Sequence, residues 1–569
     1  MSNQLKNILI WGAGKIGRGF IADLFNKAGY KLTFVDSNQE LIHRLNTQKQ
    51  YTIVNLPSLE EKEEVIIKGF QAFHIDEKDQ IFQKLKECSI LSLVVFPSAF
   101  EQVAKDIAAI IERRSREKID RSLDILMSTN ICQPSEQFKH YLFKELSDAG
   151  KYYFNRYIGL VDTLIIRMGI EPTPEMKEKD PLTILTNGYP ELTLDRPAFK
   201  GKPPQFKGLL YTTNMAHEEK RKMYTYNTIH AVYAYLGKQK GYQYIIESIQ
   251  DQATQQMAVE ALNESSRALQ KEFGYSNEEM KEWNNRVLKN MANPMLKDKI
   301  NRVGADPIRK LKKEDRLIGP ALMCIRNGIM PYFLAKAVAA AFLFVSEEDQ
   351  ASSTIQEYLK NHSIKEAIRE FCQLDREVEL IQLISEHYQK FLNKITLEKD
   401  FYKIKKLKEC YEIGFEYEKN YRGCAQCLIA TFFKFTGKTN NTLFQSASGL
   451  SGGMALCGDS ACGGYSGGIM IMGSYVGRRL EKLDLDGDKE AQYKAYEMAQ
   501  KLHDKFIETY GSVICADIHK QIFGKSFCLR SKEVRKEFEE AGAHLDKCTT
   551  VVAMAASWVA DILNDEGYL

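Results

Sequence analysis

Three residues that could carry out acid–base catalysis lie within the sequence KMYTYNTIH, which runs from Lys222 to His230. A partly buried lysine loses some of its preference for the charged form, so a neutral amine can take a proton from a hydroxyl. Asn227 can donate to the oxygen as it becomes a carbonyl, and His230 can orient either partner. Taken alone, these residue types on a helix are more typical of a solvated face than of a catalytic site.

The segment that carries these residues has the period of an amphipathic helix docked on a core. Its apolar positions recur at spacings of three and four, namely Tyr226, Ile229, Tyr233 and Leu236. At roughly 100° per residue, the three polar side chains would project over an arc of roughly 140°. They would therefore flank the buried stripe.

A glycine turn near the start of the chain favours the catalytic interpretation. The apolar run Ile8 to Trp11 predicts a buried strand, GAGKIG follows it at once, and a helical pattern comes next. The first glycine permits a tight turn, the second lets a pyrophosphate approach the backbone, and the third allows the helix to pack close to the strand. We expect the phosphates at the helix N-terminus, bound by Gly12, Ala13, Gly14, Ile16 and Gly17.

An acidic residue at the end of the second predicted strand indicates which dinucleotide is bound. The strand Lys31 to Val35 leads into Asp36, at the distance from the glycine turn expected of the group that accepts from a ribose 2′-hydroxyl. Ser37 and Asn38 supply no cation for a 2′-phosphate. The sequence therefore predicts NAD rather than NADP.

Together these stretches resemble the polyol-specific long-chain dehydrogenases of the mannitol dehydrogenase family, over roughly residues 1 to 390. The signature of that family is Lys, four residues, Asn, two residues, His, which matches Lys222, Asn227 and His230. The runs GAGKIGRGFIADLF and NPMLKDKINRVGADPIRKLKKEDRLIGPAL are similar to the family as well. Two positions depart from it, because Thr163 stands where Arg is common and Thr129 replaces an acidic residue before Asn130.

The resemblance implies a metal-independent hydride transfer with NAD, in which Lys222 is the acid/base and Asn130 joins Asn227 in polarising the reacting oxygen. The expected reaction interconverts mannitol 1-phosphate and fructose 6-phosphate. A related polyol or hexuronate substrate of the altronate or mannonate type is the first alternative. The second is a redox-sensing or metal-binding protein that uses the dinucleotide fold as a ligand module.

Length and composition limit the number of domains, the kind of partner and the location of the protein. A chain of 569 residues is too long for one core, so three domains are expected. The net charge of +3 gives no reason to expect nucleic acid as a partner. The longest apolar run, Ala337 to Val345, is too short to span a membrane, and the start of the chain leaves no room for a signal peptide. We therefore expect a cytoplasmic protein that acts on a small molecule, and a monomer is compatible with the sequence.

The first two domains are expected to have different fold classes. Residues 1–195 alternate apolar runs with helical patterns, which predicts a Rossmann-like, doubly wound α/β domain. Strands expected at 90–96 and 122–128 would bring their loops to the carboxyl edge where ligands bind. Asn130 lies in the second of these loops, where it could also be a turn residue, and Asp162 could bind a substrate hydroxyl or end a strand. After a Pro- and Gly-rich connection at 190–210, residues 196–392 read as a mainly α-helical substrate domain.

Five cations lie within eight residues of the helical domain: Arg309, Lys310, Lys312, Lys313 and Arg316. Such a run is usually a solvated face. A sugar phosphate, however, needs cations near its pocket, and arginine suits that task. Arg309 and Lys310 are the candidates for a phosphate site.

Residues 395–569 are expected to form a third, α-helical and cysteine-rich domain. Eight of the twelve cysteines lie from Cys410 onward, and ten glycines fall between residues 449 and 477. This part resembles a family of redox-active proteins named for its cysteine pattern, with Gly464 where that pattern usually has Ala. The matching positions, for which the resemblance implies redox activity, are Cys424, Cys462, Cys515 and Cys548.

Helical spacing leaves three interpretations of these cysteines open. Cys424 and Cys427 share one helical face, as do Cys515 with His519 and His544 with Cys548. A redox dithiol, a metal ion or cluster, and ordinary core packing all fit these spacings. The stretch DLDGD at 484–488 resembles a calcium loop, but its glycine comes one position early, so a helix-capping turn is expected.

Overall fold

The computed structural model describes residues 6–57, 61–131, 133–293, 298–395, 401–483 and 488–569. The chain forms two compact units. The first consists of Met1–Lys222 and Arg286–Lys297, and the second of Met223–Asn285 and Asp298–Leu569. The domain boundaries expected near 195 and 395 stay predictions.

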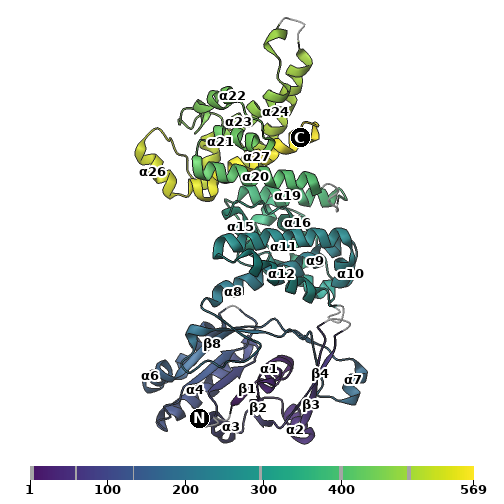
Figure 1. Cartoon of the computed structure of the whole chain (residues 1–569), viewed down its shortest axis with the longest axis vertical. Coiled ribbons are helices and arrows are strands. Elements are labelled where there is room, and N and C mark those ends of the chain that lie inside the picture. The colour runs from purple at the N-terminus through teal and green to yellow at the C-terminus, as the bar shows by residue number, and fades with distance from the viewer. Residues whose placement is uncertain (1–5, 58–60, 132, 294–297, 396–400, 484–487) are drawn as a thin grey trace. The chain divides into compact units, whose positions relative to one another are not determined.

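A mostly parallel sheet of eight strands forms the centre of the first unit, with the order β12-β11-β8-β7-β6-β1-β2-β5 (Figure 1). Only the β11–β8 pair is antiparallel among the pairings of this sheet. The Rossmann-like prediction is confirmed. The strands are β1 Asn7–Trp11, β2 Lys31–Asp36, β5 Gln71–His74, β6 Ile90–Leu93, β7 Leu123–Met127, β8 Ile158–Leu164, β11 Leu192–Asp195 and β12 Leu209–Thr212.

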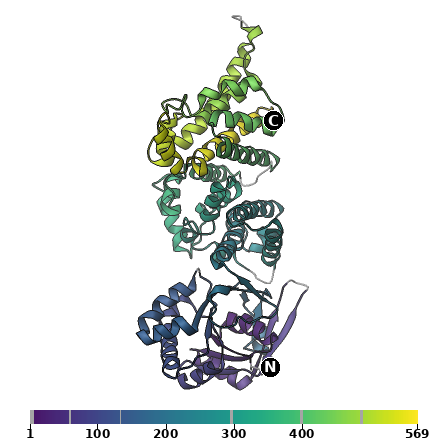
Figure 2. The ribbon, with the colours of Figure 1, turned by 60° about the vertical axis from the view of Figure 1, so that its left-hand side comes forward.

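Both faces of this sheet are buried, because the apolar runs of the sequence point side chains alternately to each side. On β1, Ile8 and Ile10 join one core, whereas Leu9 and Trp11 join the other. Helices α1 and α2 cover the first face and α3–α6 the second, as two views show (Figures 1 and 2). The helices of this part are α1 Ala22–Lys27, α2 Gln39–Gln48, α3 Lys78–Glu87, α4 Phe100–Arg116, α5 Pro134–Glu145, α6 Asp148–Tyr157, α7 Pro174–Lys179 and α8 Met215–Lys222.

A second sheet, with the order β4-β3-β10-β9, was not expected from the sequence. Its strands are β3 Gln50–Asn55, β4 Glu63–Lys68, β9 Gly169–Ile170 and β10 Ile184–Thr186. Most of β4 is exposed and β9 has only two residues, so neither shows the alternation that predicts a strand. One other expectation was wrong, because the strand expected to reach residue 96 ends at Leu93. The stretch 190–210, expected to connect two domains, contains β11 and the start of β12.

The described residues from Thr228 to Leu392 are mainly helical, as the sequence predicts. At its centre, every residue of α16 is buried, which fits its run of alanines and aromatic residues. The helices are α9 Thr228–Gln239, α10 Ile245–Gln250, α11 Gln252–Phe273, α12 Asn277–Met291, α13 Ile300–Gly304, α14 Pro307–Lys310, α15 Ile318–Arg326, α16 Tyr332–Phe342, α17 Gln350–Leu359, α18 Ile364–Cys372 and α19 Val378–Leu392.

The cysteine-rich part is also helical, and its last helix is almost wholly buried. That helix, α27, packs along α20 and against α21, α23 and α24 (Figure 1). The lysine-rich stretch from Lys403 to Lys408 is part of helix α20. The helices are α20 Phe401–Tyr421, α21 Cys424–Thr436, α22 Asn441–Ser446, α23 Gly463–Val476, α24 Lys489–Tyr510, α25 Cys515–Phe523, α26 Lys532–Glu540 and α27 Cys548–Asp565.

Within the second unit, two buried polar contacts join these helices to the preceding ones. The Lys408 ammonium on α20 lies 2.7 Å from the carboxylate of Glu264 on α11. The Tyr510 hydroxyl on α24 donates to Glu379 on α19 over 3.1 Å. Among the helices that the structure describes, none has both the length and the hydropathy needed to cross a membrane. Residues 484–487 of the DLDGD stretch lie outside the described residues.

Candidate active site and cysteine pocket

The glycine turn after β1 has the shape that a dinucleotide requires. Gly12 has a φ of +106°, and a Cβ there would lie 2.1 Å from the carbonyl oxygen of Val94. A Cβ at Gly17 would lie 2.0 Å from the carbonyl oxygen of Gly12, so only glycine fits at either position. A Cβ at Gly14, in contrast, would meet no described atom within 4 Å. The turn is closed on the protein side and open where a pyrophosphate would approach.

Asp36 lies at the end of β2 beside this turn. Its carboxylate accepts from the backbone N–H of Ala13 over 2.7 Å and from that of Asn38 over 2.9 Å. The turn is further held by Arg18, whose side chain is buried and donates to the carbonyl oxygen of Ala13 over 2.7 Å. Sequence reasoning did not identify this arginine. Ile16 packs against the core below the turn.

Lys222 is the last residue of α8, and its ammonium contacts two groups from the carboxyl edge of the sheet. It donates to the side-chain oxygen of Asn130 over 2.6 Å and to the carbonyl oxygen of Ile165 over 2.7 Å. Asn130 follows β7 and Ile165 follows β8. The structure thus brings together two of the predicted catalytic residues.

Glu219 lies one helical turn before Lys222 and was missed by the sequence analysis. Its carboxylate accepts from the backbone N–H of Gln133 over 3.1 Å. Burial raises the pKa of Glu219 to about 7, with Asp162 adding to the rise and Lys222 opposing it. Its spacing of three residues from the lysine was the available signal, since positions i and i+3 share a helix face.

Asp162 lies inside β8 rather than at a strand end. One carboxylate oxygen accepts from the Ser135 backbone N–H over 2.8 Å and the other from the Ser135 hydroxyl over 2.6 Å. Burial raises the pKa of Asp162 despite these bonds. The contact fixes the first turn of α5, and a role in substrate binding stays a prediction.

In the second unit, the segment from Met223 to Asn227 is a π-helical turn that leads into α9. The regular rotation of about 100° per residue does not hold through such a turn, and π turns occur often at functional sites. The Asn227 amide donates toward the sulfur of Met223 over 3.3 Å.

His230, on α9, is paired with a carboxylate that the sequence analysis did not single out. Its Nε2 lies 3.1 Å from Asp298, which also contacts Arg302. Although burial opposes it, hydrogen bonding to His230 and Arg302 holds the pKa of Asp298 below its usual value. The run NPMLKDKIN, quoted above for its resemblance, contains this aspartate and was the available signal.

The predicted phosphate ligands already have partners in the protein. The Arg309 guanidinium lies 2.9 Å from Asp306 and 3.6 Å from Asp315. Lys310 is buried and donates to the carbonyl oxygen of Ala305. Burial and two neighbouring arginines lower the pKa of Lys310 to about 8. A phosphate-binding role for either residue stays a prediction.

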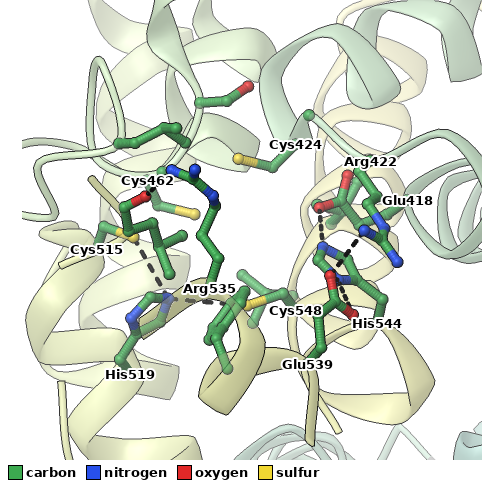
Figure 3. A pocket seen from close by; sticks show the side chains of 18 of the residues that line it. Glu418, Arg422, Cys424, Cys462, Cys515, His519, Arg535, Glu539, His544 and Cys548 are labelled. Carbon is green, nitrogen blue, oxygen red and sulfur yellow. Dashed lines mark hydrogen bonds and ion pairs between the residues drawn. The ribbon is translucent and has the colours of Figure 1, made fainter. Parts of the chain in front are cut away.

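Four cysteines line one cavity of about 370 Å³ in the cysteine-rich part (Figure 3). They are the four matched to the family pattern, Cys424, Cys462, Cys515 and Cys548. Every described cysteine of the chain is a free thiol. Cys427 does not line the cavity, because its sulfur is turned toward the carbonyl oxygens of Tyr417 and Arg422.

Each of the four cysteines stands at the start of a helix. Cys424, Cys515 and Cys548 are the first residues of α21, α25 and α27, and Cys462 is the N-cap of α23. A Cβ at Gly463 would lie 2.3 Å from the sulfur of Cys424, so this glycine lets α21 and α23 approach. Burial raises the pKa of all four thiols, to about 12 for Cys424 and about 11 for Cys462.

The two histidines of the cavity have different partners. His519 Nε2 lies 3.5 Å from the sulfur of Cys515 and 3.8 Å from that of Cys548. His544 instead contacts the carboxylates of Glu539, at 2.9 Å, and Glu418, at 3.6 Å. The pairing of Cys515 with His519 expected from helical spacing is therefore formed, whereas that of His544 with Cys548 is not. Within the described ranges, no group of three or more His, Cys, Asp or Glu side chains is arranged to hold a metal ion.

Comparison with known proteins identifies both parts of the chain. Residues 6–208 match the Mannitol dehydrogenase Rossmann domain and residues 215–392 the Mannitol dehydrogenase C-terminal domain. The mannitol-1-phosphate 5-dehydrogenase of Caldanaerobacter subterraneus is 32% identical over 387 residues, which cover 68% of this chain and 99% of that protein. The chain belongs to the mannitol dehydrogenase family. The resemblance inferred from the sequence is confirmed, and with it an NAD-dependent dehydrogenase.

A second relative and two solved structures of similar fold agree with this assignment. The mannitol-1-phosphate 5-dehydrogenase of Thermoanaerobacter pseudethanolicus is also 32% identical, over 67% of this chain and 96% of its own length. A crystal structure of D-sorbitol dehydrogenase shares the fold with a TM-score of 0.60 at 12% identity, covering 69% of this chain and 97% of that one. Pseudomonas fluorescens mannitol 2-dehydrogenase, in a ternary complex with NAD and D-mannitol, has a TM-score of 0.53 at 15% identity, over 69% and 93% of the two chains.

Residues 423–562 match a different family, described as "Putative redox-active protein (C_GCAxxG_C_C)". All four cavity cysteines fall within the matched range. The two mannitol dehydrogenase domains match residues up to 392, so the cysteine cavity lies in a part of the chain beyond them.

Proposed function

We propose that the protein interconverts mannitol 1-phosphate and fructose 6-phosphate with NAD as the cofactor. The observation that carries this proposal is the contact between Lys222 and Asn130 at the carboxyl edge of a dinucleotide-binding sheet. The names of the relatives support the choice of a polyol phosphate over a free polyol.

NAD would be held by the glycine turn and by Asp36. The backbone between Gly12 and Gly17 would receive the pyrophosphate at the open side above Gly14, and the Asp36 carboxylate would accept from the ribose hydroxyls. When bound, the nicotinamide exchanges a hydride with the substrate carbon.

Lys222 would exchange the proton of the substrate hydroxyl. The carbonyl oxygen of Ile165 and the amide oxygen of Asn130 hold its amine in place. As the alcohol is oxidised, the amine takes the proton, and in the reverse direction the ammonium returns it to the developing oxyanion. An ammonium group supplies the positive charge that this step needs, so the proposal requires no metal at this site.

The roles of Asn227 and His230 rest on the family signature. Asn227 would donate to the reacting oxygen, and His230, held by Asp298, would orient the substrate. Asp162, Arg309 and Lys310 are the remaining candidates for substrate contacts. A cytoplasmic location and a monomeric state also stay predictions.

A substrate screen tests the proposal. The full chain would be assayed with NADH and fructose 6-phosphate, fructose, tagaturonate or fructuronate, by following NADH absorbance. We expect the highest kcat/KM with fructose 6-phosphate and activity that survives chelators. A preference for fructose would show that the substrate is a free polyol rather than a polyol phosphate. A preference for tagaturonate or fructuronate would show that the protein is a hexuronate dehydrogenase.

A further inference from the structure

The cysteine cavity contains a thiol pair that shares one base. The Cys515 and Cys548 sulfurs lie 3.5 and 3.8 Å from the same nitrogen, Nε2 of His519 (Figure 3). The distance between the two sulfurs therefore cannot exceed the sum of these two distances. They come from the starts of α25 and α27, two separate helices that meet at this point.

His519 is placed to take a proton from either thiol. Its ring is buried, and burial lowers the pKa of the imidazole to about 4, so it is neutral near pH 7. A neutral imidazole with its proton on Nδ1 offers the lone pair of Nε2 as an acceptor. Burial also raises the pKa of both thiols, so neither is ionised at rest near pH 7. The proton of the attacking thiol must therefore leave while the sulfur reacts, and Nε2 of His519 is the acceptor placed beside it.

The cavity also favours an anionic ligand. Three helices, each of nine residues or more, begin at its cysteines, namely α21, α23 and α25, and helix N-termini attract negative charge. Arg535 and Lys536 line the cavity as well. Arg535 donates to the carbonyl oxygens of Leu529 and Arg530, which carry no net charge to cancel its own. The two carboxylates of the lining are themselves paired, Glu539 with Arg422 at 2.9 Å and Glu418 with His544 at 3.6 Å.

The size of the cavity fits a molecule rather than a single ion. A volume of about 370 Å³ lies within the range of small-molecule sites. Apolar side chains such as Leu456, Phe538 and Val552 line it together with the polar groups. A ligand with a flexible, partly apolar body and negatively charged ends would match these walls.

We propose that the cavity binds low-molecular-weight disulfides that carry carboxylate or phosphate groups, and that Cys515 and Cys548 reduce them. This activity is separate from the dehydrogenase reaction and does not depend on it.

The proposed reaction is a thiol–disulfide exchange in which atoms and electrons balance. As the Cys515 sulfur attacks one sulfur of the ligand, whose S–S bond breaks, the Cys515 proton passes to Nε2 of His519. The departing thiolate takes the proton, which leaves a mixed disulfide on Cys515. Cys548 then loses its proton to the same nitrogen and attacks Cys515, releasing the second small thiol. Two protein thiols are oxidised to one disulfide, and one small disulfide is reduced to two thiols.

The test compares two disulfides of opposite charge on the reduced full chain. Oxidised glutathione carries carboxylates and cystamine carries ammonium groups. Released thiol would be followed in time, and the protein disulfide located by peptide mass mapping. We expect a Cys515–Cys548 disulfide and a rate with oxidised glutathione at least about tenfold above that with cystamine, since a positive site concentrates anions.

Single substitutions resolve the steps. Cys548→Ser should trap a mixed disulfide on Cys515, whereas Cys515→Ser should trap none there and release little thiol. His519→Gln should slow release without changing which cysteines react. Cys528→Ser, an exposed cysteine outside the cavity, should behave as the wild type. Arg535→Gln should lower the ratio of the rate with oxidised glutathione to the rate with cystamine. Arg530→Gln, at an exposed position, is the matched control and should leave that ratio unchanged.

Three results would overturn the proposal. The first is a protein disulfide between other cysteines, the second is a rate with cystamine equal to or above that with oxidised glutathione, and the third is a protein that reacts with neither. Bound zinc or iron in such an inert protein would assign the four thiols to a metal instead.

Discussion

The ammonium of Lys222 and the side-chain oxygen of Asn130 lie 2.6 Å apart, although 92 residues separate them in the chain. A helix end and a strand end therefore meet at one point on the carboxyl edge of the sheet. Since Asn130 accepts through its oxygen here, it orients the lysine directly. It could stabilise an oxyanion only if its amide nitrogen turned toward the substrate.

Lys222→Ala should lower kcat by roughly two to four orders of magnitude, because the proton of the substrate hydroxyl then has no positioned acceptor. NAD binding should be unchanged, since the glycine turn is untouched. Steady-state kinetics and NAD titration measure the two effects. Lys220→Ala, exposed on the same helix, is the control. Near-normal turnover by the Lys222 variant would exclude the lysine as acid/base.

Two alanine substitutions in the glycine turn should act differently. At Gly12 the new Cβ would lie 2.1 Å from the Val94 oxygen at a φ of +106°, so Gly12→Ala should lower the thermal unfolding midpoint. At Gly14 no described atom lies within 4 Å, so Gly14→Ala should keep that midpoint and weaken NAD binding by filling the space above the turn. Normal NAD affinity in Gly14→Ala would place the pyrophosphate elsewhere.

Asp36 should set the choice of cofactor. Its carboxylate would accept from the ribose hydroxyls of NAD, whereas a 2′-phosphate would meet like charge. The wild type should therefore have a lower kcat/KM with NADP than with NAD, and Asp36→Ala should reduce that difference. Asp36→Ala also removes the bond to the Ala13 N–H, so Asp36→Asn, which retains an acceptor, separates the two effects. Equal use of both cofactors by the wild type would contradict the assignment.

The sequence predicted the first sheet and the glycine turn well, because strands buried on both faces and a turn of fixed chemistry leave local signals. It did not predict β9 or β4, since one is too short and the other too exposed for a periodic pattern. The Lys222–Asn130 contact follows from the parallel sheet, which brings successive strand ends to one edge.

Two features of the sites depend on burial and on local helix geometry, and the sequence did not predict them. Glu219 carries a raised pKa only because the fold covers it, and spacing alone cannot reveal that. In the cysteine cavity, helical spacing correctly paired Cys515 with His519 but paired Cys548 with His544. The second pairing failed because His544 lies in a π-helical turn, Ala543–Lys547, that ends just before Cys548 and alters the rotation that the spacing rule assumes.

Glu219 should make stability depend on pH. Burial raises its pKa from 4.5 to about 7, so the folded protein holds this proton more tightly than the unfolded chain. Its stabilising contribution is fully present below pH 4.5 and is lost as the pH rises through about 7. Glu219→Gln, neutral at every pH, should therefore flatten the fall in unfolding midpoint between pH 5 and pH 8. The exposed Glu136→Gln should leave the fall intact, and an unchanged fall in Glu219→Gln would exclude the carboxyl as its source.

Lys408→Met should strongly destabilise the second unit. Glu264 is fully buried and also accepts from the backbone N–H groups of Phe333 and Leu334, so its carboxylate stays in place when the ammonium is removed. Breaking a buried ion pair from one side costs about 3–5 kcal/mol, because a buried charge is left uncompensated.

Two further measurements test whether the uncompensated charge of Glu264 causes the loss of stability in Lys408→Met. Burial already raises the pKa of Glu264, so at low pH the carboxyl of Lys408→Met can protonate and the loss of stability should shrink. Denaturant unfolding at pH 5 and pH 8 measures this difference. Lys405→Met, exposed on the same helix, should cost little at either pH. If the two variants lose equal stability, the pair with Glu264 does not hold α20 against α11, and the attachment of the cysteine-rich helices must come from apolar packing.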